Sequence, residues 1–213
     1  MEYFDILDGT GEKTGGRISR DEAHRLGIWH RAFHCLITYE RNGRRVVLFQ
    51  KRSLNKKIAP GKFDVSVGGH IASGEDTRSA GLREIAEELG LTVRFENLVS
   101  VGCRIFVYCF TPEIKEYEFQ DIFLLPLHDQ PSTITIQEEE LDGLLEMDIQ
   151  EGIALFSGET QSIVGSFLNP GASCPEELPV VAQDFVPCLD NYYFKMLLLA
   201  QRYHSGERKY LVI

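Results

Sequence analysis

Three glutamates at helical spacing constrain this chain more than any other feature. Residues 77–89 carry apolar side chains at intervals of three and four, and Gly90 is placed to end a helix there. On such a helix Glu84, Glu87 and Glu88 share one face, and no Lys stands at the matching helical positions. Carboxylates packed this closely repel one another unless a hard cation lies between them, and Mg²⁺ or Mn²⁺ prefers such oxygen ligands. The sequence therefore predicts a helix over residues 77–89 that holds a divalent metal.

The loop before this helix carries residues suited to support the metal site. Glu75 and Arg83 lie eight residues apart across the junction of loop and helix, a spacing at which they can pair and brace the loop. Gly68 and Gly69 lack side chains, so the backbone there can offer carbonyls to a metal or N–H groups to phosphate oxygens. We expect an architectural role for Glu75 and Arg83, and a ligand-binding role for the glycine pair.

The residues around the glutamates fill a longer pattern. From Gly69 the chain runs GHIASGEDTRSAGLREIAEELGL, which matches G-x5-E-x7-R-E-U-x-E-E-x-G-U, with U aliphatic, at every specified position. In this pattern the segment resembles the Nudix box. The resemblance implies a Mg²⁺-dependent hydrolase that cleaves a phosphoanhydride bond of a nucleoside diphosphate derivative or a related organic diphosphate, and a metal-binding carbonyl at Gly68. A solvated acidic helix face is the alternative for the glutamates alone, but the other matching positions favour the metal site.

A second set of residues resembles one branch of that superfamily, the isopentenyl-diphosphate isomerase-like proteins. The resemblance covers roughly residues 1–150 and lies in residues 23–24, 27–33, 50–52 and 60–61. In the isomerases three histidines and glutamates hold a divalent metal. The matching residues, which we expect to bind a second metal or the substrate, with packing as the alternative role, are His24, His30, His70 and Glu118.

Two departures from the isomerase pattern favour hydrolysis. The isomerases need a cysteine before the Gly-His pair, where this chain has Gly68, and a proton-transferring glutamate on a later strand, where our alignment places Gln120. Without these groups the movement of a proton across the substrate has no evident mechanism. An isomerase-type enzyme and a non-catalytic ligand-binding module of the same fold remain the alternatives.

Two charged segments are further candidates for the site. Lys51 and Arg52, with more basic residues in the loop that follows, are predicted to bind phosphate together with the backbone of Gly69, although a solvated basic loop has the same composition. The acidic run 138–140 includes candidates for an additional metal ligand or a general base. An ordinary acidic start of a helix is equally consistent with that run.

Charge and cysteine content exclude several classes of protein. A formal net charge of -10 argues against binding to long nucleic acids, which requires clustered Lys and Arg. The five cysteines are odd in number and include no C-x-x-C pair, so we expect reduced core residues. The chain has neither an apolar, basic N-terminal signal nor an apolar run of about eighteen residues, which predicts a cytoplasmic protein that does not bind membranes. The family resemblance adds the expectation of a homodimer.

The order of the predicted elements gives the fold class. We expect an α/β (α+β) Nudix fold, in which a mixed β-sheet is sandwiched between helices, with residues 1–157 as the domain, residues 158–178 as a loop and residues 179–213 as a helical segment packed on the domain. The strands are predicted at residues 3–7, 31–39, 45–51, 63–67, 93–110 with a break, 117–127 and 133–136, and further helices at residues 19–27 and 148–156.

Overall fold

A mixed sheet organises the structure, a computed structural model that describes residues 2–128, 134–172 and 174–213. Within these residues the strands are β1 (Tyr3–Leu7), β2 (Lys13–Ser19), β3 (His30–Arg41), β4 (Arg44–Arg52), β5 (Phe63–Val65), β6 (Val67–His70), β7 (Val99–Thr111), β8 (Ile114–Pro126), β9 (Leu141–Asp148), β10 (Ile163–Leu168) and β11 (Glu176–Val180). The helices are α1 (Arg20–Leu26), α2 (Thr77–Leu89), α3 (Ile149–Ser157) and α4 (Tyr192–His204), with 3-10 helices η1 (Phe95–Asn97) and η2 (Ala182–Asp184).

The large sheet grows outward from the hairpin of β3 and β4. Its turn places Asn42 and Gly43 at φ 52° and 75°, the positive values that a tight two-residue hairpin needs, as the sequence predicted. The strand order is β11-β10-β9-β4-β3-β8-β7, with β5 paired to β4 and β6 paired to β3. Because β3 runs parallel to β8 and antiparallel to β4, the sheet is mixed, which confirms that prediction.

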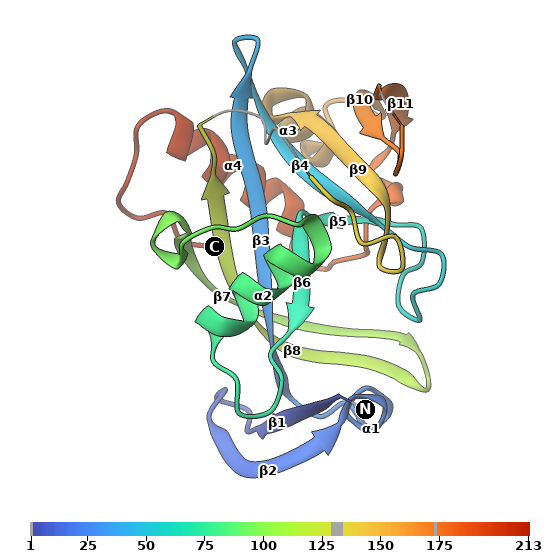
Figure 1. Cartoon of the computed structure of the whole chain (residues 1–213), viewed down its shortest axis with the longest axis vertical. Helices are drawn as coiled ribbons and strands as arrows, with labels where there is room; N and C mark the ends of the chain where they lie inside the picture. Colours follow the sequence, from blue (N-terminus) through green and yellow to red (C-terminus); the bar gives the residue numbers. More distant parts are fainter. Residues whose placement is uncertain (1, 129–133, 173) are drawn as a thin grey trace.

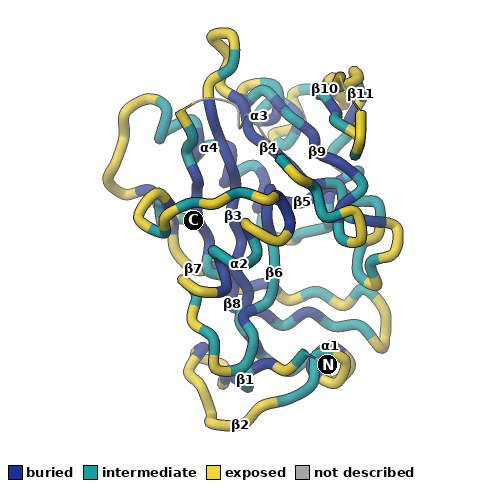
Figure 2. The backbone as a smooth tube through the Cα atoms, in the orientation of Figure 1, coloured by how far each residue is buried: buried dark blue, intermediate teal, exposed yellow. Residues whose placement is uncertain are grey.

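Helices cover both faces of this sheet (Figure 1). Helix α2 packs on one face, where Ile85 and Leu89 join a core with Phe33, and α3 and α4 cover the other face. At Gly81 a Cβ atom would overlap the ring of Phe33, so a glycine is required for α2 to approach the sheet this closely. The predicted sandwich of sheet and helices is confirmed, and its central strands are the most deeply buried (Figure 2).

A small N-terminal unit lies at one end of the sheet (Figure 1). Strands β1 and β2 form a separate antiparallel hairpin, and α1 follows directly. Helix α1 begins after Ser19, whose hydroxyl donates to Glu22, and ends at Gly27 with φ 68°, which matches the predicted short helix. The strand at residues 3–7 was also predicted, whereas β2 was not.

The second half of the chain departs from the prediction. Residues 158–178 were expected to be a loop, but they contain β10 and the start of β11. In β10 Ile163, Gly165 and Phe167 are buried alternately, a strand pattern that the surrounding Gly, Ser and Pro residues concealed. The C-terminal segment was expected to be helical from its start, whereas its α-helix spans only Tyr192–His204.

Two further differences concern the middle of the chain. Strand β9 lies in the centre of the sheet but was not predicted, because its acidic leading residues suggested the approach to a helix. The strand expected at residues 133–136 is absent from residues 134–136, and residue 133 lies outside the described part.

The cysteines are all free, yet only Cys35 is buried, so the prediction of core positions is wrong for most of them. No helix in the described part is long and apolar enough to cross a membrane.

Candidate active site

Helix α2 presents Glu84 and Glu88 toward the sheet, whereas Glu87 is exposed. Asp76 caps the helix by accepting a hydrogen bond of 2.7 Å from the backbone N–H of Ser79, and Gly90 ends it with φ 66°. This fixed start and end orient the face that carries Glu84 and Glu88. Glu88 is only 3% exposed, and its Oε2 accepts weak contacts of 3.3 Å from the N–H of Gly68 and 3.4 Å from Gln50 Nε2.

The predicted brace between loop and helix is present. Arg83 donates from Nε and Nη2 to the two carboxylate oxygens of Glu75, at 3.1 and 3.0 Å, and Nη2 also reaches the carbonyl of His70 at 3.3 Å. The third nitrogen, Nη1, lies 2.7 Å from Glu84 and 3.0 Å from Glu87. The absence of a Lys at the matching helical positions therefore does not leave the cluster unpaired, because the arginine inside the pattern supplies part of the countercharge.

Two of the glutamates lie in surroundings that disfavour their charge. Burial, followed by repulsion from Glu84, raises the pKa of Glu88 to about 8. Burial also raises the pKa of Glu84. At Gly69 a Cβ atom would overlap the carboxyl group of Glu84, so the glycine leaves the space in which this carboxyl group lies. The arrangement keeps two carboxyl groups close together, with a hydrogen bond from Arg83 to Glu84 as part of the countercharge, and a divalent cation would supply the remainder.

The glutamates of α2 line a cavity of about 250 Å³. Arg52 contributes to its wall, with Nε 3.1 Å from the carbonyl of Ile58 and Nη1 3.5 Å from Asp64. Lys51 points to the other face of the sheet, with Nζ 5.1 Å from the centre of the Phe167 ring. Because neighbours on a strand alternate between faces, only one of these two basic residues can face the cavity, and placing Lys51 there was wrong.

The loop after β4 and the acidic run each add one residue to the cavity. Lys56 lines it and is paired with Glu140, which lines it as well. Burial lowers the pKa of Lys56, because the ammonium group loses solvent there. Of the predicted acidic run 138–140, Glu140 is therefore the residue that the structure places beside the carboxylates of α2.

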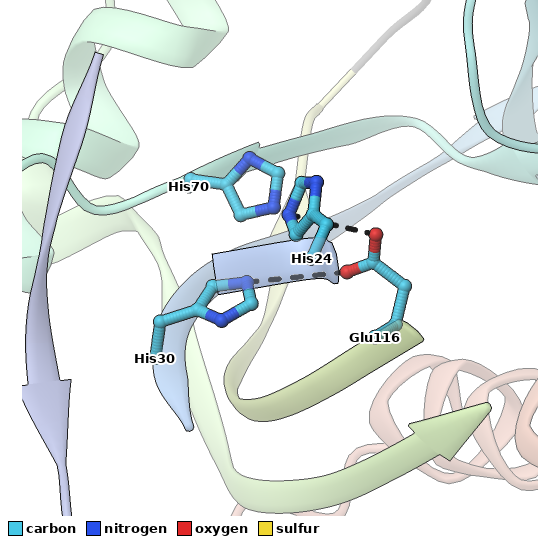
Figure 3. Close-up of side chains that lie close together, drawn as sticks. All are labelled: His24, His30, His70 and Glu116. Carbon is cyan, nitrogen blue, oxygen red and sulfur yellow. Dashed lines mark ion pairs between the residues drawn. The ribbon is translucent and has the colours of Figure 1, made fainter. Parts of the chain in front are cut away.

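The predicted histidines gather beside this cavity, and of the three only His70 is part of its wall. His24 comes from α1, His30 from β3 and His70 from β6, and with Glu116 of β8 their ligand atoms lie within 4.8 Å of one another (Figure 3). Glu118, also on β8, lies 3.1 Å from His70 Nε2 and 3.5 Å from His30 Nε2. We call these five residues the histidine centre.

Several atoms of the histidine centre have no hydrogen-bond partner among the described residues. His24 Nε2, His30 Nε2 and Glu116 Oε1 are buried and make no hydrogen bond, since the carboxylate oxygens that face the two imidazole nitrogens lie 3.5–3.9 Å away. Buried polar atoms in this state cost free energy unless a further group fills the centre. Burial, then repulsion from His70 and His30, lowers the pKa of His24 to about 3, so its imidazole is neutral. Imidazoles and a carboxylate are the donors that a transition metal such as Zn²⁺ prefers. His70, whose contacts with Glu116 and Glu118 outweigh burial and raise its pKa to about 9, would release a proton when it binds the metal. The residues present therefore fit a metal.

Glu116 was missed by the sequence interpretation, which placed the two acidic positions at Glu118 and Gln120. In the structure the two residues of β8 that face the histidines are Glu116 and Glu118, each two positions earlier than predicted. The signal was present in the alternation of Glu116, Glu118 and Gln120 along one face of β8. A glutamate therefore does face the centre, and only Gly68, in place of a cysteine, remains as a departure from the isomerase pattern.

Comparison with known proteins agrees with this fold. The NUDIX domain profile matches residues 28–160. An uncharacterized Nudix hydrolase of Clostridium acetobutylicum is 33% identical over 202 residues, which cover 93% of this chain and 96% of that protein. The isopentenyl-diphosphate Delta-isomerase of Corynebacterium diphtheriae is 28% identical over 150 residues, which cover 68% of this chain and 78% of that protein.

A solved structure supports the fold independently. The crystal structure of a protein from Deinococcus radiodurans matches with a TM-score of 0.53 and 24% identity, over 74% of this chain and 90% of that chain. At this identity the likeness shows the fold alone. The sequence profile, the full-length relative and the architecture agree, and the chain belongs to the Nudix hydrolase superfamily.

Proposed function

We propose that this chain hydrolyses a phosphoanhydride bond of a nucleoside diphosphate derivative or a related organic diphosphate, with Mg²⁺, or Mn²⁺ in its place. The ligands would be Glu84, Glu87, Glu88 and the carbonyl of Gly68. One observation carries the proposal: the buried carboxyl groups of α2 open into the same cavity as the guanidinium of Arg52. Such a cavity offers both the metal ligands and a positive group for a diphosphate.

The residues of the cavity would have different roles in hydrolysis. A bound divalent cation would supply Lewis acidity and lower the pKa of a water molecule. Arg83 holds Glu84 and Glu87 in place by its hydrogen bonds. Arg52 and the backbone of Gly69 would bind phosphate oxygens, and Glu140, from the acidic run, would accept the proton of the attacking water.

Substitution of the glutamates tests the hydrolase proposal. Glu87→Gln and Glu88→Gln should each reduce the release of phosphate or nucleotide by at least about 100-fold across a panel of nucleotide sugars, dinucleotide polyphosphates and nucleoside di- and triphosphates. Glu96→Gln is a matched control, because Glu96 is an exposed carboxylate outside α2 that pairs with Arg78 at 2.8 Å. Unchanged product release in both α2 variants would contradict the role of these glutamates in hydrolysis, and the absence of product release by the wild type across the panel would favour a ligand-binding module.

The histidine centre supports a second candidate function, an isomerase-type reaction. Its three imidazoles and two glutamates match the donor set that the isomerase resemblance implies, and we propose a second metal there. Against isomerisation stands Gly68, which leaves no thiol opposite the glutamates. Incubation with isopentenyl diphosphate in deuterated water distinguishes the two reactions: deuterium incorporation indicates isomerisation, and phosphate release without incorporation indicates hydrolysis.

A further inference from the structure

We propose that Gln120 and Arg104 are positioning residues for the histidine centre, and that they connect it to the C-terminal segment through Asp190. This inference rests on the proposed second metal. Hydrogen bonds of 2.6–2.8 Å link Asp190 to Arg104, Arg104 to Gln120 and Gln120 to Glu118, and this chain is half-buried at Asp190 and buried from Arg104 onward. Each residue would fix the orientation of the next, and the last contacts His70.

The chain begins with a bidentate ion pair. Arg104 of β7 donates from Nε and Nη2 to the two oxygens of Asp190, at 2.8 and 2.7 Å. Its guanidinium carbon lies 3.9 Å from the centre of the Tyr192 ring and 4.6 Å from that of Phe106. A guanidinium group held by two parallel hydrogen bonds and by aromatic rings has a single orientation.

That orientation fixes the amide of Gln120. Arg104 Nη1 lies 2.8 Å from Gln120 Oε1, and because a guanidinium group can only donate, the amide oxygen must face it. The amide nitrogen then has to point along β8, where it donates to Glu118 Oε2 at 2.6 Å. Arg104 thus determines which end of the amide meets Glu118.

The result is a carboxylate with one anchored oxygen. Oε2 of Glu118 is held by Gln120, while Oε1 faces His70 at 3.1 Å and His30 at 3.5 Å. Outer residues of this kind orient metal-binding carboxylates and strengthen metal binding. Glu118 would therefore offer a single, fixed oxygen to a metal in the histidine centre.

The other end of the hydrogen-bond chain lies in the wall of the cavity. Val186, Pro187 and Cys188 line the cavity, and Asp190 follows them after one residue. The C-terminal segment that lines the cavity is thus attached, through Asp190 and Arg104, to the residue that orients Glu118. An ion pair between Arg104 and Asp190 alone would only stabilise the fold. The hydrogen bonds from Arg104 to Gln120 and from Gln120 to Glu118 connect this pair to the histidine centre.

Cobalt binding tests this inference without relying on catalysis. Metal-free protein is titrated with Co²⁺, and the absorption bands of histidine-bound cobalt are followed. Gln120→Leu removes both hydrogen bonds, and Gln120→Glu keeps an acceptor for Arg104 but cannot donate to Glu118. Both should weaken cobalt binding by about 10–100-fold and shift the bands. Asp190→Asn, at a half-buried position, should weaken it by about tenfold.

The controls separate loss of positioning from loss of folding. Glu146→Gln disturbs a comparable group away from the cavity. Glu146 accepts hydrogen bonds of 2.9 Å from Arg41 and 2.6 Å from Tyr39. This variant should leave the cobalt absorption bands unchanged. His70→Ala should abolish them. If the Gln120 and Asp190 variants bind cobalt as tightly as the wild type, the positioning role is overturned. Should the Gln120 variants not fold, the cobalt affinity of Asp190→Asn alone tests that role.

The failure of one proposal can be told from the failure of another. If His70→Ala leaves cobalt binding intact, no metal occupies the histidine centre, and the positioning inference falls with it. The hydrolase proposal is judged separately, by product release from Glu87→Gln, and does not depend on the cobalt bands.

Discussion

The ring of Phe4 stacks on the imidazole of His30, with centroids 4.7 Å apart and planes inclined by 12°. Phe4 also lies 4.6 Å from the ring of His70 and is fully buried. The N-terminal hairpin of β1 and β2 thus covers the histidine centre with one aromatic side chain. This contact makes the hairpin part of the site rather than a peripheral addition.

Removal of this ring should both destabilise the protein and open the centre. Phe4→Ala is expected to lower the free energy of unfolding by about 3–5 kcal/mol, as measured by urea denaturation. It should also speed the loss of cobalt to a chelator, because water gains access to the ligands. Tyr3→Ala, at the neighbouring half-exposed position, serves as the control. An unchanged rate of cobalt loss in Phe4→Ala would show that the hairpin does not shield the centre.

The brace between Arg83 and Glu75 should matter more for catalysis than for stability. Arg83→Lys replaces a planar group that contacts three carboxylates with a point charge, so Glu84 and Glu87 lose their alignment. We expect kcat to fall by about 10–100-fold. Because the pair is partly exposed, the free energy of unfolding should change by about 1 kcal/mol or less. Steady-state kinetics and urea denaturation of the same preparation measure both, and equal kcat values would contradict the alignment role.

Local patterns in the sequence were sufficient for the elements around α2. Its helix depends on residues three and four apart, its cap on Asp76 and its end on Gly90, and all of these lie within one short segment. The hairpin of β3 and β4 likewise depends on Asn42 and Gly43 at its turn. Such features are fixed by neighbours along the chain, so a single sequence reveals them.

Features that depend on distant pairing could not be predicted in the same way. Strand β10 is recognisable as a strand only once β9 lies beside it, and β9 only once β4 is known to be its partner. The link between Arg104 and Asp190 joins residues separated by 86 positions. The position of Lys51 depended on which face of β4 meets α2, and the sequence of that strand, apolar on both faces at residues 46–49, does not distinguish them.

The stability of the metal-free protein should depend on the protonation of Glu88. Its pKa rises from an ordinary value of 4.5 to about 8 on folding, so the folded state binds the proton more tightly than the unfolded state. The resulting stabilisation is complete below the unfolded pKa and is lost as pH rises through the folded one. The free energy of unfolding should therefore fall over this interval.

A comparison with Glu88→Gln isolates this effect from the other titrating groups. The pKa of His70 is raised to about 9 because its contacts with Glu116 and Glu118 outweigh burial, and this change acts in the same direction. The difference between the wild-type and variant unfolding curves removes that contribution. At pH 8 the metal-free variant should unfold at a higher temperature, by about 2–4 °C for each kcal/mol recovered. Mg²⁺ should reverse the order, and a pH-independent difference would contradict the assignment.

Substitution of Gly69 should weaken metal binding while leaving the fold in place. The methyl group of Gly69→Ala would overlap the carboxyl group of Glu84, which can move only by leaving its hydrogen bond with Arg83. We expect Mn²⁺ affinity, measured by electron paramagnetic resonance, to fall by at least about tenfold, since a displaced ligand loses the geometry that its neighbours imposed. Gly9→Ala is the matched control, because a Cβ there meets nothing within 4 Å and Gly9 has no positive φ. Equal Mn²⁺ affinities in the two variants would show that the position of the Glu84 carboxylate does not govern metal binding, and Glu87 and Glu88 would then have to hold the ion without it.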